Sequence, residues 1–133
     1  MSRRDTTAGL KDIREAIERI QRYVGTLGLD DFLTNTEKQD AVVRNFEIIG
    51  EATKGLPAEF RKTHKHIEWT EMAGFRDKLI HHYFGLNLRI LWDVVQTRLP
   101  PLREQIDELH LSARARIIVL FLRRGSAVGR PVR

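Results

Sequence analysis

Apolar residues recur over the first 25 positions of the chain with the period of an α-helix. The set consists of Leu10, Ile13, Ile17, Ile20 and Val24. Its members lie three or four positions apart, so they fall on one face of a helix whose other faces are charged. Gly25 follows the last of them and predicts the end of this first helix.

A second helix is predicted between Thr36 and Gly55. The segment Thr36-Glu37-Lys38-Gln39 has the form of a capping box. In this motif the Thr36 hydroxyl accepts a hydrogen bond from an early backbone N–H, and Gln39 reaches back toward the cap. The predicted buried face of this helix carries Val42, Phe46, Ile49 and Thr53.

A third helix is predicted in the middle of the chain. Met72, Phe75 and Leu79 fall at helical spacing, and Gly85 is a suitable end. Gly74 lies inside this pattern, so the helix is expected in one piece or in two pieces that meet there.

A fourth helix is predicted to begin at Asn87, a residue type that caps helix N-termini. Its apolar stripe consists of Leu91, Val95, Leu99, Leu102, Ile106 and Leu109. Pro100 and Pro101 interrupt the stripe, and prolines inside a helix are expected to kink or divide it.

The order of these elements predicts the fold class. No useful length of residues 1–109 alternates with period two, so the class is all-α. Short links between amphipathic helices favour an antiparallel four-helix bundle with a kinked fourth helix. About 109 residues bury only about two thirds of their unfolded surface, so a second copy or a partner protein is expected to add burial.

The last part of the chain has a different composition. Residues 110–133 carry six arginines and no acidic residue, whereas residues 1–109 carry 17 basic and 18 acidic residues. We therefore expect a helical domain over 1–109 and a basic, flexible C-terminal tail over 110–133. The run Ile117–Leu122 is strand-like in composition, and the tail is expected to be disordered or weakly helical.

Composition narrows the classes of function. The 133 residues include no cysteine, which excludes disulfide scaffolds, thiol catalysis and Cys-based zinc fingers. The longest apolar run has six residues, and no apolar segment follows the charged start of the chain, so neither a membrane span nor a signal peptide is expected. We expect a cytoplasmic protein without a membrane partner.

The densest cluster of reactive side chains is the segment Arg76–Tyr83, Arg-Asp-Lys-Leu-Ile-His-His-Tyr. An arginine and a histidine without a set of metal ligands suffice to cleave RNA by attack of its own 2′-OH on the adjacent phosphate. The imidazole exchanges protons near neutral pH, and the guanidinium fork matches the charge that grows on the phosphoryl oxygens. DNA has no 2′-OH and cannot react in this way.

A structural interpretation competes with the catalytic one. On a helix Tyr83 lies nearly above Arg76, whereas His81 lies about 140° around the axis. An arginine and a histidine at this spacing also occur by chance, in which case Arg76 would form a salt bridge with Asp77 or Glu51. Glu51, one turn after Glu47 on the second predicted helix, would orient Arg76 only if that helix faces the same cleft.

Two motifs together resemble a known family. The segment Asn45–Glu51, Asn-Phe-Glu-Ile-Ile-Gly-Glu, is followed at the expected separation by the pattern Arg-x4-His-x-Tyr of residues 76–83. This combination, within a match over nearly all of residues 1–109, is similar to the HepT family of HEPN-domain toxins.

The resemblance implies the toxin of a toxin–antitoxin pair: an all-α homodimer that acts as a metal-independent endoribonuclease and needs no cofactor. Its implied partner is a minimal nucleotidyltransferase antitoxin of the MntA type. Carried over by position, Arg76 and His81 become the catalytic pair, and Tyr83 becomes the side chain that the partner modifies with AMP. Family dimers bring both copies of the motif to one cleft, which accounts for an arginine and a histidine that do not share a helical face.

This chain departs from the family pattern in two places. Asp77 stands where the family usually has Asn, so a carboxylate lies beside the implied phosphate site, where it either weakens RNA binding or anchors Arg76. His82 is a second imidazole next to His81, so the assignment of His81 rests on its spacing. The alternative function is a catalytically silent HEPN module that serves as partner or substrate of the nucleotidyltransferase.

Overall fold

The computed structural model describes the backbone of residues 3–81 and 87–129, and the side chains of residues 6–78 and 87–124. Helices and their connecting turns make up these residues, and no strand is found among them. The elements are α1 (Arg3–Val24), α2 (Leu29–Leu33), α3 (Thr36–Lys54), α4 (Ala58–Thr63), α5 (Trp69–His81), α6 (Leu88–Asp93), the π-helical turn η2 (Val94–Arg98) and α7 (Leu99–Gly129). The predicted all-α class is confirmed.

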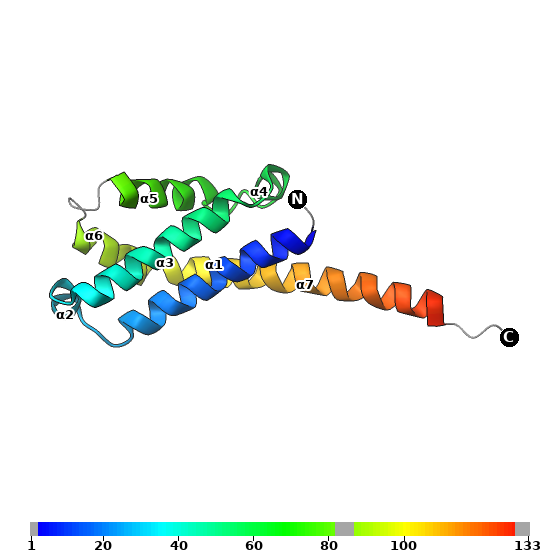
Figure 1. Cartoon of the computed structure of the whole chain (residues 1–133), viewed down its shortest axis with the longest axis horizontal. Helices are drawn as coiled ribbons and strands as arrows, with labels where there is room; N and C mark the ends of the chain where they lie inside the picture. The colour runs from blue at the N-terminus through cyan, green and yellow to red at the C-terminus, as the bar shows by residue number, and fades with distance from the viewer. Residues whose placement is uncertain (1–2, 82–86, 130–133) are drawn as a thin grey trace.

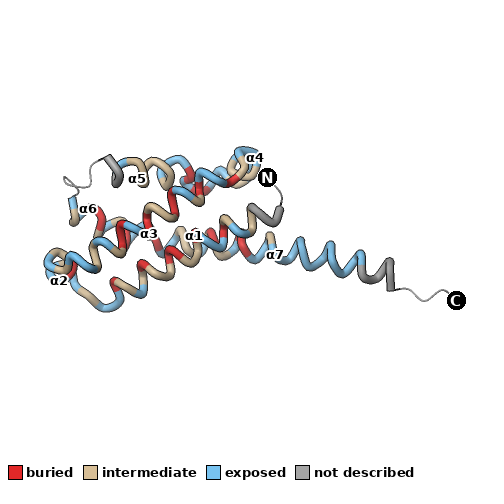
Figure 2. The backbone as a smooth tube through the Cα atoms, in the orientation of Figure 1, coloured by how far each residue is buried: buried red, intermediate tan, exposed pale blue. Residues whose placement is uncertain are grey.

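The long helices form an antiparallel bundle. Along the chain, α1, α3, α5 and the α6–α7 unit run in alternating directions (Figure 1). Helix α3 packs against α1 and α5, and α1 also packs against α7. Figure 2 shows the buried positions on the inward sides of these helices.

The predicted apolar stripes form the core. All five stripe residues of α1 are buried, as are the four predicted on α3. Phe46 on α3 and Phe75 on α5 meet edge to face, with ring centroids 4.9 Å apart. Two ion pairs tie α1 to α7 at the surface: Arg103 Nη2 lies 3.0 Å from Glu18 Oε1, and Arg14 Nε lies 2.9 Å from Asp107 Oδ1.

The helix ends follow the predicted signals, with one correction. Gly25 has φ 51°, a left-handed conformation that favours glycine and ends α1. The cap of α3 is Asn35 rather than the predicted Thr36, because the Asn35 side chain accepts a hydrogen bond from the Lys38 N–H at 3.0 Å. Gln39 donates to the carbonyls of residues 32 and 33 instead of closing a capping box. Asn87 caps α6 as predicted.

The fourth predicted helix is divided one turn before its two prolines. The π-helical turn η2 separates α6 from α7, and Pro100 and Pro101 occupy the second and third positions of α7. A proline has no N–H to donate and its ring collides with the carbonyl four residues earlier. The wider turn of a π-helix relieves that collision, so the prolines are accommodated without a break in the chain direction.

The predicted disordered or weakly helical tail is instead a helix. Helix α7 continues without interruption from Leu99 to Gly129 and projects beyond the bundle (Figure 1). Residues 110–124 contain neither glycine nor proline, and alanine, leucine and arginine are good helix formers. The strand-like run therefore extends a helix that the bundle has already nucleated. None of the described helices is long and apolar enough to span a membrane.

Candidate functional site

The structure brings together three of the predicted site residues. Arg76 and Asp77 lie on α5, and Glu51 lies on the facing side of α3. His81 is the last residue of α5, and its side chain lies outside the described ones. His82 and Tyr83 also lie outside the described residues. The described part of the candidate site therefore consists of Arg76 and the residues around it.

The backbones of α3 and α5 approach each other closely at Arg76. A Cβ atom built on Gly50 would lie 2.1 Å from the Arg76 Cβ and 2.7 Å from its Cγ. Real Cβ contacts are never this short, so only glycine fits at this position of α3. The absence of a side chain at Gly50 allows the stem of Arg76 to lie directly against the α3 backbone.

Two carboxylates hold the Arg76 guanidinium. Nη2 lies 3.1 Å from Glu51 Oε2, and Nη1 donates a hydrogen bond to Asp77 Oδ1 at 3.1 Å. Both partners that the structural interpretation named are therefore present. The Arg76 side chain is 28% exposed, so its stem is packed while part of the guanidinium still faces solvent.

Lys54 extends this cluster by one charge. Its Nζ donates a hydrogen bond to Asp77 Oδ1 at 2.7 Å. The hydrogen bonds from Lys54 and then from Arg76 hold the pKa of Asp77 below its usual range. The result is an alternating row of charges, Glu51, Arg76, Asp77 and Lys54, that spans the contact between α3 and α5.

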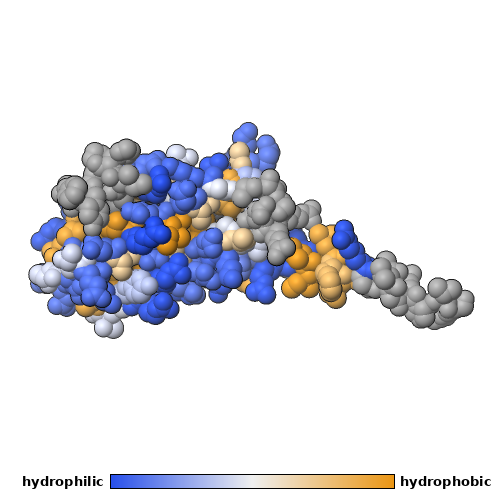
Figure 3. All heavy atoms as spheres, in the orientation of Figure 1, coloured by the Kyte–Doolittle hydropathy of each residue, from blue (hydrophilic) through white to orange (hydrophobic). Residues whose placement is uncertain are grey.

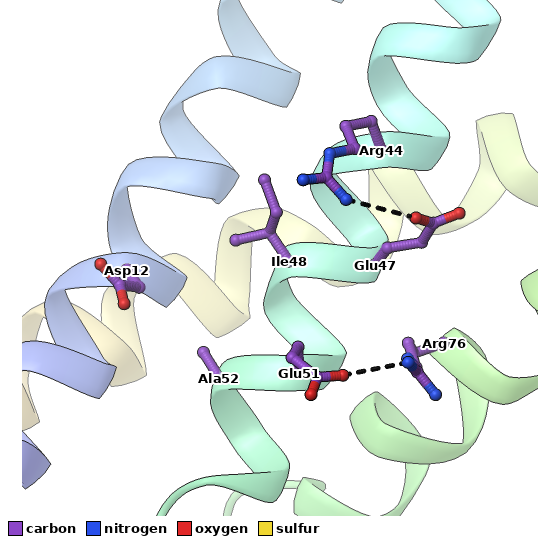
Figure 4. A pocket seen from close by; sticks show the side chains of 7 residues that line it. All are labelled: Asp12, Arg44, Glu47, Ile48, Glu51, Ala52 and Arg76. Atoms are coloured by element: carbon purple, nitrogen blue, oxygen red, sulfur yellow. Dashed lines mark ion pairs between the residues drawn. The ribbon is translucent and has the colours of Figure 1, made fainter.

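An open hollow of about 450 Å³ lies next to this cluster, between α1, α3 and α5. Its lining residues are Asp12, Arg44, Glu47, Ile48, Glu51, Ala52 and Arg76. Figure 4 shows Arg44 paired with Glu47 at one end of the hollow and Arg76 paired with Glu51 at the other. The Arg44 Nη1 to Glu47 Oε2 distance is 3.6 Å, and the Arg44 side chain is largely exposed. Each of the two arginines that line the hollow thus pairs with a carboxylate that also lines it.

The remaining described histidines lie away from Arg76. His64 packs against Phe60, with ring centroids 4.6 Å apart, and burial followed by the charges of His66 and Arg116 lowers the pKa of His64. His110 is buried on α7, and burial followed by Arg14 and Arg114 lowers its pKa. In the described part of the chain, no three His, Cys, Asp or Glu residues are grouped so as to hold a metal ion.

Sequence reasoning missed the parts that Gly50, Lys54 and Arg44 play around Arg76. Gly50 belongs to the motif that carried the family resemblance, but its physical role is a contact with another helix. Lys54 follows Gly50 by one helical turn, on the same side of α3. That spacing is the signal that would have found it once α3 and α5 were known to face each other.

The chain matches a family model described as "Ribonuclease HepT-like" over residues 13–109. A "Probable ribonuclease HepT" from Thermococcus cleftensis is 46% identical over 100 residues, which cover 75% of this chain and 91% of that protein. A "Putative RNase TTE0752" from Caldanaerobacter subterraneus is 43% identical over 100 residues, 75% of this chain and 89% of that protein. A "Putative RNase MJ0127" from Methanocaldococcus jannaschii is 41% identical over 109 residues, 82% and 90% of the two chains. No solved structure matches significantly.

Proposed function

Since this chain belongs to the ribonuclease HepT-like family, we propose that it is an endoribonuclease whose catalytic pair is Arg76 and His81. The observation that carries this proposal is the state of Arg76. Its stem is fixed against Gly50, two carboxylates set the direction of its guanidinium, and the side chain remains 28% exposed beside an open hollow. A prepositioned, partly exposed guanidinium is suited to bind a phosphate in a bidentate manner.

The proposed reaction needs no metal ion or cofactor. His81 takes the proton from the ribose 2′-OH, whose oxygen attacks the neighbouring phosphorus while the bond to the 5′-oxygen breaks. The departing 5′-oxygen takes up a proton, and a 2′,3′-cyclic phosphate remains. Arg76 binds the non-bridging oxygens, on which negative charge grows in the transition state.

The positions of the two residues favour a homodimer as the active species. Five residues along a helix separate Arg76 from His81 by about 7.5 Å along the axis and about 140° around it. A pair so arranged on one helix cannot both face one phosphate from the same side. Two copies of α5 that meet at a shared cleft would supply Arg76 from one subunit and His81 from the other.

We further propose that the protein is the toxin of a toxin–antitoxin pair. Its antitoxin would be a minimal nucleotidyltransferase of the MntA type that transfers AMP to Tyr83. Tyr83 belongs to the same short motif as Arg76 and His81, so an attached AMP would bring bulk and negative charge to the phosphate site. This addition would block RNA without any change in the fold.

RNA cleavage by purified variants tests the catalytic proposal. Arg76→Ala and His81→Ala are expected to lose RNA cleavage by about 100-fold or more while retaining helical circular dichroism. Arg98→Ala is the matched control, because Arg98 is an exposed arginine that pairs with Glu68 and Glu71 rather than with Glu51 or Asp77. Cleavage at the control level by either catalytic variant would contradict the assigned roles.

One observation favours the silent module as the second candidate. Glu51 and Asp77 already occupy the Arg76 guanidinium, and both carboxylates compete with phosphate for it. The silent module predicts a stable complex with the nucleotidyltransferase and no cleavage by the unmodified protein. The intact mass after co-expression with that partner, with fragment spectra across residues 76–89, tests the modification separately. An added AMP on Tyr83 supports the toxin and its nucleotidyltransferase partner, whereas an unmodified Tyr83 beside an active partner leaves sequestration by binding or the silent module as the better account.

A further inference from the structure

The end of α7 exposes large apolar side chains on every side. We call residues 111–124 the extension; it follows Leu109 and His110, which are buried. Leu111 and all six residues of the run Ile117–Leu122 are exposed, from 38% at Ile117 to 74% at Phe121. All residues of the extension are exposed except Ala113, which is partly buried (Figure 2), and Figure 3 shows the apolar surface of the extension outside the bundle. Exposed apolar surface of this kind marks a site of interaction.

The apolar run covers the full circumference of the helix. Consecutive residues are about 100° apart, so six of them make more than one and a half turns. Leu111, Ile118 and Leu122 lie on one side, opposite to the side that continues the core-facing stripe, where Ile117 and Leu120 lie. A flat protein surface would cover one of these sides and leave the other in water, whereas hydrocarbon surrounds both.

The charges of the extension are all positive and flank the run. Arg114 and Arg116 precede it, Arg123 and Arg124 follow it, and residues 110–133 contain no acidic residue. In the first half of α7, by contrast, Asp107 pairs with Arg14 of α1. The described arginines of the extension are exposed, so an anion from outside the chain can pair with them.

We propose that the extension binds in the interface of an anionic lipid membrane. The run is about 9 Å long in a helix, against a hydrocarbon core of about 30 Å, so it enters one leaflet without spanning the membrane, and the apolar side chains on both of its sides reach hydrocarbon. The arginines extend their aliphatic stems from the apolar surface toward the lipid phosphates. The sequence predicts no membrane partner, because its longest apolar run of six residues is too short to span a membrane.

Charge disfavours the two other occupants. Two extensions packed side by side would bring the arginines of both chains together without an acid in either, and like charges beside a helical seam repel. RNA would neutralise the arginines but would leave the apolar run in water. The membrane satisfies the charge and the apolar surface together. This inference is independent of the ribonuclease proposal.

Co-sedimentation of the full chain with vesicles tests the proposal. We expect binding to vesicles that contain phosphatidylglycerol and little binding to vesicles of phosphatidylcholine alone. Each basic residue near an anionic surface strengthens binding by about fivefold, so the double variant Arg123→Glu, Arg124→Glu is expected to bind at least about 25-fold more weakly. The double variant Ile118→Ser, Phe121→Ser is expected to bind about tenfold or more weakly, because it removes buried apolar area.

The matched control carries the same change of charge at the other end of the bundle. Arg22→Glu, Arg89→Glu alters two exposed arginines on α1 and α6, away from the extension (Figure 1), and is expected to bind like the wild type within about fivefold. All variants should keep the helical circular dichroism and the RNA cleavage of the wild type.

Three outcomes would overturn the proposal. The first is the absence of wild-type binding to anionic vesicles. The second is equal loss in the control and in the arginine variant, which would indicate attraction by net charge alone. The third is a wild type that does not bind vesicles and that has a larger particle size by light scattering than the Ile118→Ser, Phe121→Ser variant. This result would identify a second copy of the chain as the occupant.

Discussion

The α3–α5 contact and the extension of α7 both place charged side chains beside apolar surface, but they differ in how those charges are paired. At the contact, Arg76 lies between two carboxylates and its stem packs against Gly50. In the extension, arginines flank an apolar run and the segment contains no acid. The charges of the first region are paired within the chain, whereas those of the extension have no acidic residue beside them in sequence. The difference separates the site that we propose for chemistry from the surface that we propose for attachment.

The largest expected effect compares two apolar residues of α7. Ile106→Ala removes a fully buried side chain and is expected to lower the free energy of unfolding by about 2–5 kcal/mol. Leu120→Ala in the extension is expected to change it by less than about 0.5 kcal/mol, because Leu120 is exposed. Urea denaturation of both variants measures the difference. Equal losses would show that the extension is packed in the monomer.

Two glycines provide the second comparison. Gly50→Ala is expected to destabilise the protein by about 1–3 kcal/mol, because its Cβ collides with Arg76. Gly74→Ala on α5 meets no atom within 4 Å and is expected to stabilise the protein by about 0.5–1 kcal/mol. Thermal unfolding distinguishes the two. A stabilising Gly50→Ala would mean that the helices separate there at little cost.

His110 marks the border between the packed part of α7 and the extension, and it predicts a pH dependence. Its pKa is lower in the folded than in the unfolded protein, so the unfolded state takes up the proton first as the pH falls. The contribution of the neutral imidazole is therefore complete above a pH of about 6.5 and is lost below it. Urea denaturation between about pH 7.5 and 5 is expected to show this loss, and His110→Gln should flatten it. If the free energy of unfolding of the variant depends on pH as strongly as that of the wild type, groups other than His110 cause the loss.

The smallest expected effect concerns the charge row. The pKa of Asp77 is lowered in the folded state, so its contribution is present above its ordinary pKa and is lost as the pH falls through the folded value. Lys54→Met removes the first cause of that shift and is expected to raise the pKa of Asp77 toward its ordinary value. An NMR titration of the Asp77 carboxyl measures this. The same pKa in both proteins would show that Arg76 alone holds the carboxylate.

The sequence predicts the parts of the fold that depend on local pattern. The stripe of α1, its end at Gly25 and the Asn87 cap all follow from spacing and residue type, and the structure confirms them. The opposite charge of Glu51 and Asp77, together with their positions along the chain, predicts that they pair with Arg76. These features depend on one helix or on one pair.

Other features depend on contacts that no single segment contains. Gly50 is required by the side chain of another helix, and the single stripe of α3 gives no sign of it. The shift of the cap from Thr36 to Asn35 depends on where the chain turns out of α2. The flanking arginines and the Gly, Ser and Pro residues that follow predict a disordered or weakly helical tail, yet the extension continues a helix that packing against α1 has already started. The catalytic roles of Arg76 and His81 stay a proposal that the cleavage assay tests.

Because α7 is uninterrupted, the rotation of its extension about the helix axis is fixed relative to the part of α7 that packs in the bundle. Leu99 and Ile106 are locked in the core, so the direction in which Phe121 points is set by the bundle rather than by the extension. One additional alanine between residues 110 and 114 would leave the composition of the extension almost unchanged but would turn it by about 100° relative to the bundle. The bundle thereby determines which of its faces lies toward the partner that binds the extension.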